Sequence, residues 1–352
     1  METEVVIIEE KNIDDVAKEN LKKAGQIIKD GGLVAFPTET VYGLGGDALN
    51  PKSSQKIYAA KGRPSDNPLI VHVAEFEDLT RIVSSVPDSA KKLAAAFWPG
   101  PLTMIMNKND KVPYETTGGL DTVAIRMPNN QIALELIRQS GGYIAAPSAN
   151  TSGRPSPTLA RYCVEDLSGK IEMIIDGGQV GIGIESTIVD LTCEVPMILR
   201  PGYITADMLK EVLGEISIDR TIIDSSSTQK PKAPGMKYRH YAPKGELTIV
   251  QGSQDSVVSY INEVTKTSME QGKRVGIIGT DATKDLYKAT IVKSVGTRDD
   301  ESTIAHELFK VLREFDDENV DIMFSESFDD SGIGQAIMNR LLKAAGHHVI
   351  TV

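Results

Sequence analysis

The stretch Lys61-Gly62-Arg63-Pro64-Ser65-Asp66-Asn67-Pro68-Leu69 places two cations on a turn shaped by glycine and proline. A second polar stretch, Ser148-Ala149-Asn150, follows an apolar run from Tyr143 to Ala146 that is typical of a buried strand. Cations and short hydrogen-bonding side chains at strand ends are what a polyphosphate site in an α/β protein requires. The two stretches therefore predict an α/β fold with a phosphate site at the ends of its strands.

Short apolar runs on both sides of these stretches predict the rest of a sheet. The strand candidates are 33–36, 69–73, 102–106, 122–126, 143–146, 173–175, 187–191 and 197–199. Helical spacing of apolar residues predicts helices over about 14–29 and 131–138, and a further helix begins near Pro51. Because strands outnumber helices, we expect a mixed, twisted sheet with helices packed on it.

The composition changes after about Gly214. Residues 225–245 contain no acidic residue but several lysines and prolines, which indicates an extended linker. Strand and helix patterns then alternate as far as Val352, which predicts a small doubly wound α/β domain. We therefore expect a catalytic domain over 1–214, a linker over 215–245 and a second domain over 246–352.

The bulk composition excludes several classes of protein. The 352 residues carry a formal net charge of −11, which argues against overall electrostatic attachment to nucleic acid or an anionic membrane. The two cysteines, Cys163 and Cys193, have no metal-site spacing, so we expect neither a disulfide framework nor a zinc site. With no apparent signal peptide or membrane-spanning run, a cytosolic setting is expected.

Other candidate site residues each have a structural alternative. The stretch from Pro37 to Gly45 reads as a loop at a strand end, which can form a polar pocket or a capped turn. Lys61 can bind phosphate or complement a helix dipole, whereas Arg63 can grip phosphate with two hydrogen bonds. His72 lies in an apolar strand, where core packing is the commoner role. Arg126 can form an ion pair or hold a carboxylate ligand.

The glycine-rich residues 177–187 match the pattern of a phosphate-binding loop only weakly, because no helix clearly follows them. The linker segment Met236-Lys237-Tyr238-Arg239-His240-Tyr241-Ala242-Pro243 combines tyrosines with cations. Such a segment can be a plain tether, but its composition favours docking over a base or an anion.

Taken together, these motifs resemble one family, the YrdC-like threonylcarbamoyl-AMP synthases, in their long two-domain form. The matching pieces are residues 37–45, 61–63, 148–150, 199–202 and 234–243, together with Gly332-Ile333-Gly334-Gln335-Ala336 and Asn339-Arg340. The resemblance implies a YrdC-like mixed sheet, a linker that folds over the active site and a Rossmann-like C-terminal domain.

The resemblance also implies a reaction. L-threonine, bicarbonate and ATP would give threonylcarbamoyl-AMP and pyrophosphate, as the first step of threonylcarbamoyladenosine modification in tRNAs that read codons beginning with A. Lys61 and Arg63 would be catalytic. ATP would contact Arg63, Asn67, Thr122, Ser148, Asn150, Ser156, Arg200, Arg239 and Tyr241, and L-threonine would contact Thr40, His72, Arg126, Ala146 and Ser186. No protein metal site is implied; Mg²⁺ would accompany the nucleotide, and a separate tRNA threonylcarbamoyl transferase complex would take the product.

Two rival functions remain open at this point. A non-enzymatic module that binds tRNA or double-stranded RNA fits the basic linker, and would show steeply salt-dependent binding without ATP turnover. A carbamoyltransferase that uses carbamoyl phosphate is the other rival, since such proteins can carry a YrdC-like domain. They usually also carry cysteine-rich zinc modules, which two distant cysteines cannot supply.

Overall fold

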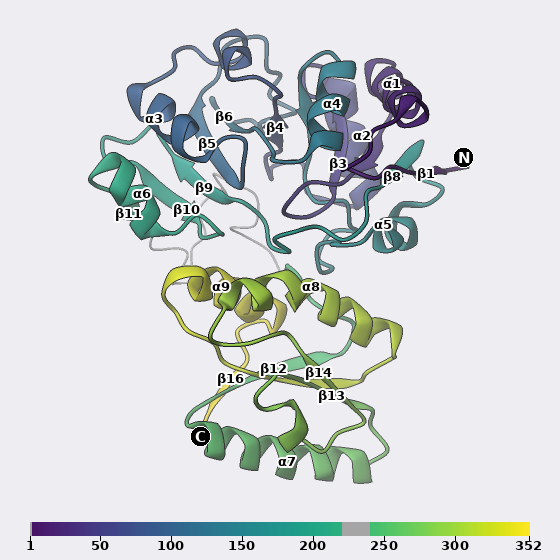
Figure 1. Cartoon of the computed structure of the whole chain (residues 1–352), viewed down its shortest axis with the longest axis vertical. Helices are drawn as coiled ribbons and strands as arrows, with labels where there is room; N and C mark the ends of the chain where they lie inside the picture. Colours follow the sequence, from purple (N-terminus) through teal and green to yellow (C-terminus); the bar gives the residue numbers. More distant parts are fainter. Residues whose placement is uncertain (1, 220–239) are drawn as a thin grey trace. The chain divides into compact units, whose positions relative to one another are not determined.

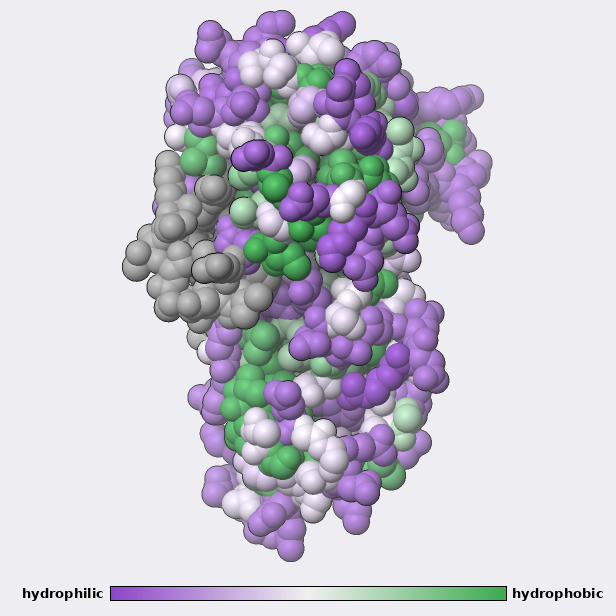
Figure 2. All heavy atoms as spheres, turned by 90° about the vertical axis from the view of Figure 1, so that its left-hand side faces the viewer, coloured by the Kyte–Doolittle hydropathy of each residue, from purple (hydrophilic) through white to green (hydrophobic). Residues whose placement is uncertain are grey.

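The computed structural model describes residues 2–219 and 240–352, which divide into two compact units (Figure 1). The first unit comprises the described parts of residues 1–152, 156–181 and 185–238, and the second comprises residues 153–155, 182–184 and 239–352. No helix in these two described ranges is both long and apolar enough to cross a membrane. On the face drawn in Figure 2, hydrophilic residues cover most of the surface, with smaller hydrophobic areas between them.

The first unit is built on an 11-stranded sheet with the order β1-β8-β2-β3-β7-β4-β6-β5-β9-β10-β11. The strands are β1 (Glu4–Ile7), β2 (Val34–Phe36), β3 (Gly43–Asp47), β4 (Ile70–His72), β5 (Leu102–Asn107), β6 (Thr122–Arg126), β7 (Ile144–Ala145), β8 (Met173–Asp176), β9 (Thr187–Asp190), β10 (Met197–Arg200) and β11 (Ser217–Ile218). Parallel pairs such as β4 with β6 and antiparallel pairs such as β5 with β6 occur in the same sheet. The prediction of a mixed sheet is confirmed.

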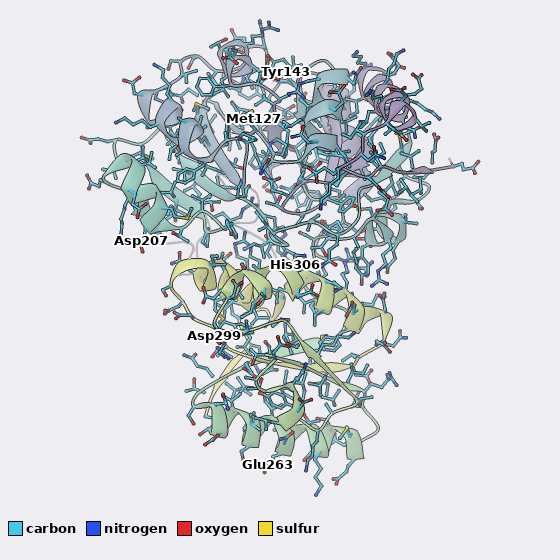
Figure 3. All side chains as sticks on the ribbon, in the orientation of Figure 1. Met127, Tyr143, Asp207, Glu263, Asp299 and His306 are labelled. Atoms are coloured by element: carbon cyan, nitrogen blue, oxygen red, sulfur yellow. The ribbon has the colours of Figure 1, made fainter. Side chains whose placement is uncertain are left out.

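Helices cover this sheet because successive strand residues point to opposite faces. Val34 and Phe36 of β2 pack in one apolar cluster with α1 and α4, whereas Ala35 packs in a second, larger cluster. Met127, labelled in Figure 3, packs against both clusters. The helices are α1 (Asp15–Lys29), α2 (Pro51–Lys61), α3 (Asp88–Phe97), α4 (Gln131–Gln139), α5 (Ala160–Leu167) and α6 (Ala206–Leu213), with a 3₁₀ turn η1 (Phe76–Arg81).

The second unit carries a five-stranded parallel sheet with the order β14-β13-β15-β12-β16. Its elements are β12 (Glu246–Gln251), α7 (Gln254–Glu270), β13 (Val275–Gly279), η3 (Lys284–Leu286), β14 (Ile291–Ser294), α8 (Glu301–Asp317), β15 (Ile322–Glu326), α9 (Gly332–Ala344) and β16 (Val349–Thr351). Figure 1 shows α7 on one face of this sheet and α8 and α9 on the other. The predicted doubly wound domain is confirmed.

The stretch from Pro37 to Gly45 was predicted as a loop throughout, and this is wrong for its end. Residues 43–45 belong to β3, which pairs with β2 and β7. A Cβ atom on Gly45 would lie 2.8 Å from Ile144 Cγ2 and 2.9 Å from Phe36 Cε1. Glycine is therefore required here by close packing inside a strand, which a sequence pattern cannot distinguish from a turn.

Candidate active site

A row of polar side chains crosses neighbouring strands of the first sheet. His72 on β4 pairs in register with Arg126 on β6, and Arg126 pairs with Thr103 on β5. Thr103 pairs with Ile188 on β9, and Ile188 pairs with Arg200 on β10, next to a register shift. Because residues paired across a sheet share a face, the fold gathers candidates from distant parts of the sequence.

Arg126 forms the centre of this row. Its Nη1 donates to Thr40 Oγ1 at 2.8 Å, and its Nη2 lies 2.6 Å from Glu39 Oε2. The side chains are only 5% and 12% exposed, respectively. The approach of Nη2 to Glu39 does not meet the angles of a hydrogen bond, and both Glu39 oxygens lack a hydrogen-bond partner among the described residues. The two groups therefore form a buried ion pair whose hydrogen-bonding capacity is largely unused.

His72 is a neutral side chain at physiological pH. Its burial, and then the nearby positive charge of Arg126, lower the pKa of the imidazole from 6.5 to about 3. Its Nδ1 lies 3.1 Å from the carbonyl oxygen of Ile70, which orients the ring. The imidazole can therefore donate or accept hydrogen bonds at this site without adding a second positive charge beside Arg126.

Ser186 connects the other end of the row. Its hydroxyl lies 2.7 Å from Thr103 Oγ1 and accepts from Arg200 Nη2 at 3.1 Å. Arg200 Nε also donates to the carbonyl oxygen of Ser186 at 3.0 Å. Nearby in the sequence, Glu185 accepts a 2.5 Å hydrogen bond from Ser156. All of these side chains are buried, so their positions are fixed by the sheet and by one another.

Lys61 is brought to the 148–150 segment by the end of α2. Asn50 caps this helix and Gly62 ends it with φ +63°, a left-handed conformation that glycine adopts without strain. Lys61 Nζ donates to the carbonyl oxygens of Ser148 and Asn150, both at 2.5 Å. Lys61 is 2% exposed, so its ammonium group is a buried cation held by backbone carbonyl oxygens. The 61–69 turn and the 148–150 segment, far apart in the sequence, are therefore in direct contact.

Arg63 and Asn67 lie in the turn that follows. Arg63 Nε donates to the carbonyl oxygen of Asn67 at 3.3 Å, and its Nη2 donates to that of Pro68 at 3.1 Å. Asn67 is 1% exposed, and within residues 2–219 and 240–352 its Oδ1 has no hydrogen-bond partner. A buried amide oxygen without a partner is uncommon in folded proteins and is typical of a position that meets a ligand or water.

The remaining candidates have less direct support. Thr122 begins β6 and, being four residues from Arg126, lies on the same face of the sheet about 13 Å away. Ala146 is buried and donates its amide to Ile70. Tyr241 belongs to the second unit, where its ring packs 5.0 Å from that of Phe309. Arg239 lies outside the described residues, as does most of the predicted linker.

Three polar residues of this region were not among the sequence candidates: Glu39, Thr103 and Glu185. Glu39 lies inside a stretch that the sequence already marked, and its neighbour Thr40 was a candidate. Thr103 has no local signal, since it lies in a short apolar strand and reaches Ser186 only through the pairing of β5 with β9. No three His, Cys, Asp or Glu side chains cluster as a metal site in the described part of the chain.

Family models match both units. Residues 26–202 match the Sua5, YciO and YrdC family, described as telomere recombination, and residues 204–346 match the C-terminal domain of threonylcarbamoyl-AMP synthase. The chain is 49% identical to threonylcarbamoyl-AMP synthase of Pyrococcus abyssi, over 94% of this chain and 96% of the relative. It is 48% identical to the Bacillus subtilis enzyme of the same name, over 94% of each.

A solved structure agrees with these relationships. The crystal structure of P. abyssi Sua5 complexed with L-threonine superposes with a TM-score of 0.93 and 46% identity. The match covers 99% of this chain and all of that one. The matches in sequence and in fold each cover more than nine tenths of both chains, and the chain belongs to the threonylcarbamoyl-AMP synthase family.

Proposed function

We propose that the polar row and the Lys61 segment bind L-threonine and ATP and join them, through bicarbonate, into threonylcarbamoyl-AMP. The chain is a nucleotidyltransferase, as are the members of its family. The synthesis of threonylcarbamoyl-AMP is the first step of threonylcarbamoyladenosine modification of tRNA. The assignment of residues rests above all on one observation, the buried Arg126–Glu39 ion pair with its unused hydrogen-bonding capacity.

The Arg126–Glu39 pair has the charges needed to receive a zwitterion. An amino acid presents a carboxylate and an ammonium group a few ångströms apart. It can therefore replace the Arg126–Glu39 ion pair with two ion pairs, one between its carboxylate and Arg126 and one between its ammonium group and Glu39. Its carboxylate would take Arg126, whose planar guanidinium suits two parallel hydrogen bonds. Its ammonium group would take Glu39, whose oxygens then gain the hydrogen bonds they lack. The exchange keeps the site neutral and offsets the desolvation of both charges.

The neighbours of this pair suit the rest of threonine. Thr40 and Ser186 offer hydroxyl groups, neutral His72 offers an imidazole, and Ala146 offers an apolar wall. A threonine hydroxyl requires a partner that can both donate and accept, and its methyl group requires apolar contact. Serine would keep the hydroxyl contact and lose the methyl contact, which supports modest discrimination between the two.

The nucleotide would lie towards the cations of the remaining segments. Lys61 and Arg63 are the proposed catalytic residues, because charge moves onto pyrophosphate as it leaves and fixed cations compensate it. The other proposed ATP contacts are Asn67, Thr122, Ser148, Asn150, Ser156, Arg200, Arg239 and Tyr241. Asn67 supports this assignment best, because its buried Oδ1 lacks a partner in the described part of the chain.

The chemistry needs no protein nucleophile. Threonine's ammonium group first releases a proton to solvent, and the neutral amine then attacks bicarbonate and expels water to give a carbamate. The carbamate oxygen attacks the α-phosphorus of ATP, and the bond to the bridging oxygen of pyrophosphate breaks. The residues contribute alignment and charge compensation. We propose that the linker closes over the site, since exclusion of water would protect the labile carbamate.

Mg²⁺ would enter on the nucleotide. The donor set fits this arrangement, because the described residues offer cations and hydroxyls but no cluster of three His, Cys, Asp or Glu side chains. The phosphate oxygens would supply its ligands and the ion would neutralise part of their charge. Beyond this reaction, we propose a cytosolic enzyme that hands its product to a tRNA threonylcarbamoyl transferase complex and makes a weak contact with tRNA or double-stranded RNA.

The test is pyrophosphate release by the purified chain with ATP, bicarbonate and either threonine, serine or no amino acid. We expect release that requires both threonine and bicarbonate. Arg126→Lys, which keeps the charge but loses the planar fork, should raise the KM for threonine more than it lowers kcat. Threonine-independent release, or release unaffected by Arg126→Lys, would contradict the proposed site. RNA binding that weakens steeply with salt and has no accompanying turnover would favour the binding module instead.

A further inference from the structure

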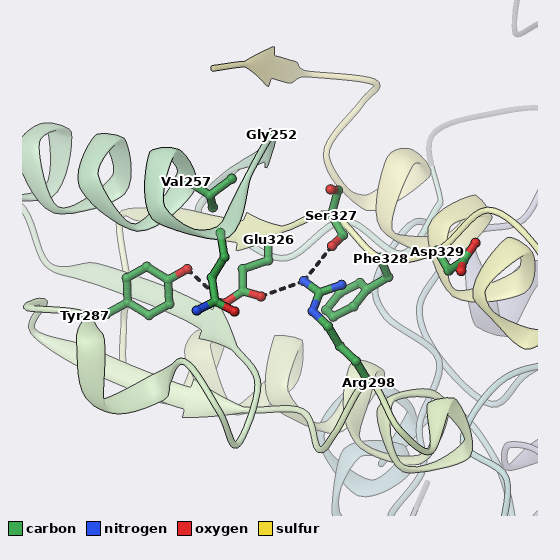
Figure 4. A pocket seen from close by; sticks show the side chains of 9 residues that line it. Gly252, Val257, Tyr287, Arg298, Glu326, Ser327, Phe328 and Asp329 are labelled. Atoms are coloured by element: carbon green, nitrogen blue, oxygen red, sulfur yellow. Dashed lines mark hydrogen bonds and ion pairs between the residues drawn. The ribbon is translucent and has the colours of Figure 1, made fainter.

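The second unit contains a cavity of about 400 Å³ whose lining includes none of the proposed substrate contacts (Figure 4). Its walls come from the turn between β12 and α7, the loop after η3, the loop before α8 and the end of β15. This volume lies within the range of small-molecule sites, which is roughly 300–1,000 Å³. The cavity is therefore large enough for a compact metabolite.

The cavity lies where this kind of sheet binds ligands. It is lined by residues that directly follow the carboxyl ends of β12 and β15, two neighbouring parallel strands. After β12 the chain enters α7 on one face of the sheet, and after β15 it enters α9 on the opposite face (Figure 1). A crevice opens between strands whose connections leave in opposite directions, and ligands of doubly wound sheets bind there.

A buried carboxylate organises the polar wall. Glu326 is 5% exposed, and its Oε1 accepts hydrogen bonds from Tyr287 at 2.8 Å and from Thr283. Its Oε2 accepts from Arg298 Nη2 at 2.7 Å. Figure 4 shows Tyr287 and Arg298 reaching Glu326 from opposite sides. Glu326 is thus a satisfied anchor that holds an arginine and a tyrosine in fixed positions at the cavity.

Arg298 is left with an open edge. Its Nη2 also donates to the carbonyl oxygen of Ser327 at 2.9 Å, and its guanidinium lies 5.1 Å from the ring of Phe328. These contacts use both hydrogens of Nη2, whereas Nε and Nη1 have no hydrogen bond to the residues that the structure describes. The side chain is 47% exposed. A positioned guanidinium with a free edge suits an incoming oxyanion.

The charges of the lining limit the anion. Arg298 and Glu326 cancel, and Asp329 at the rim adds a further carboxylate. A triphosphate would meet one paired cation and net negative surroundings, so a single phosphate is the most this wall can hold. In the 17-residue helix α7 the Ser253 hydroxyl caps the amide of Ser256, and the amides of Gln254 and Asp255, which have no intrahelical partner, can share that phosphate. Asp329 and Gln254 can accept from hydroxyl groups, and Phe328 and Val257 supply apolar contact.

We propose that this cavity binds a nucleoside monophosphate. The phosphate would contact Arg298 and the amino end of α7, the ribose hydroxyls would contact Asp329 or Gln254, and the base would lie against Val257 and Phe328. This site would be separate from the proposed ATP site, since none of its lining residues is among the proposed ATP contacts. Its failure or success therefore says nothing about threonylcarbamoyl-AMP synthesis.

The experiment is photolabelling of the full chain with 8-azido-AMP, followed by peptide mapping. We expect label on peptides from residues 252–257 or 326–329, and loss of that label on competition with AMP. Arg298→Ala should weaken AMP competition about tenfold to a hundredfold, as expected for loss of a charge-assisted contact. Lys61→Ala should leave this label unchanged, because Lys61 belongs to the other unit.

A second variant guards against misfolding. Arg298→Ala leaves Glu326 without its cation, so Gln254→Trp is used to fill the cavity while the ion pair stays intact, and it should also abolish the label. The same peptides are competed with ribose 5-phosphate and with threonine. Competition by ribose 5-phosphate weaker than that by AMP supports the proposal. Absence of label in residues 252–329, label that survives both variants, or competition by threonine but not AMP would overturn it.

Discussion

Each unit of this chain holds an arginine–glutamate pair, and the two pairs are satisfied to different extents. Arg126 lies 2.6 Å from Glu39, both are buried, and the Glu39 oxygens lack hydrogen bonds to the described residues. Arg298 lies 2.7 Å from Glu326, which is buried and fully engaged by Thr283, Tyr287 and the arginine. The two pairs have nearly the same distance between arginine and glutamate, and they differ in how many hydrogen bonds the glutamate accepts from other residues.

This difference indicates two ways of preparing for a ligand. A buried ion pair whose polar atoms lack hydrogen bonds lowers the stability of the folded protein. A ligand that forms those hydrogen bonds removes this cost, and the free energy recovered favours its binding. A fully satisfied carboxylate is instead a fixed support that orients the free edge of its arginine. We therefore expect substitutions of the first pair to change substrate binding, and substitutions around the second to change stability first.

The largest effect should come from Lys61, a buried cation in the same unit as the first pair. Lys61→Ala removes a buried charge from the proposed phosphate site, so the rate of pyrophosphate release should fall by about 10²–10³, by analogy with loss of one oxyanion donor. The control is Lys52→Ala, an exposed lysine of the same helix, which should leave the rate unchanged. A Lys61→Ala protein that binds threonine normally yet keeps its full rate would remove Lys61 from the catalytic group.

The next largest effect should separate Glu39 from an ordinary ion-pair partner. Glu39→Gln keeps the shape but removes the charge that we assign to the substrate ammonium group. The KM for threonine should rise by about tenfold to a hundredfold with a smaller change in kcat, since one charged hydrogen bond is worth about 1.5–3 kcal/mol. Glu77→Gln, an exposed change in η1, is the matched control. An unchanged KM, with thermal stability lowered, would make Glu39 purely structural.

The pH dependence of stability should report on His72. Its pKa is about 3 in the folded chain and 6.5 when unfolded, so the unfolded state binds the extra proton between these values. This contribution to stability is complete above pH 6.5 and is lost as the pH falls, by about 1.4 kcal/mol per pH unit. The free energy of unfolding, measured by urea titration at pH 7, 6 and 5, should change less steeply with pH in His72→Gln than in His347→Asn, an exposed control. Equal slopes would show that His72 does not titrate in this way.

The smallest effect should come from the second pair. Tyr287→Phe removes one of the donors to Glu326, so the free energy of unfolding should fall by about 1–3 kcal/mol because a buried charge loses a partner. Pyrophosphate release should stay at the wild-type rate. The control is Tyr260→Phe on α7, measured by the same urea titration. Loss of enzyme activity in Tyr287→Phe, without unfolding, would break the contrast between the two units.

The sequence predicted the two classes of sheet and most of their strands, because the apolar runs are short, frequent and local. The helix that ends at Lys61 was also predictable, since Pro51 and Gly62 are start and stop signals. β3 was missed, because glycines chosen for close packing against Phe36 and Ile144 look like loop residues. β1, β11, β14, α3, α5 and α6 were not predicted; β11 falls at the start of the stretch taken as the linker, and all three strands lie at the outer ends of their sheets.

By itself the sequence determined the local chemistry: cations on a turn at 61–63, short polar groups at 148–150 and alternating strands and helices after residue 246. Contact between Lys61 and the 148–150 segment, and the register of His72, Arg126 and Thr103, were decided only by the tertiary structure. The physical reason is that strand pairing joins residues far apart in the chain, and a shift by one residue would turn each side chain to the other face. The spacing of residues along the sequence therefore does not predict which residues of neighbouring strands pair with one another.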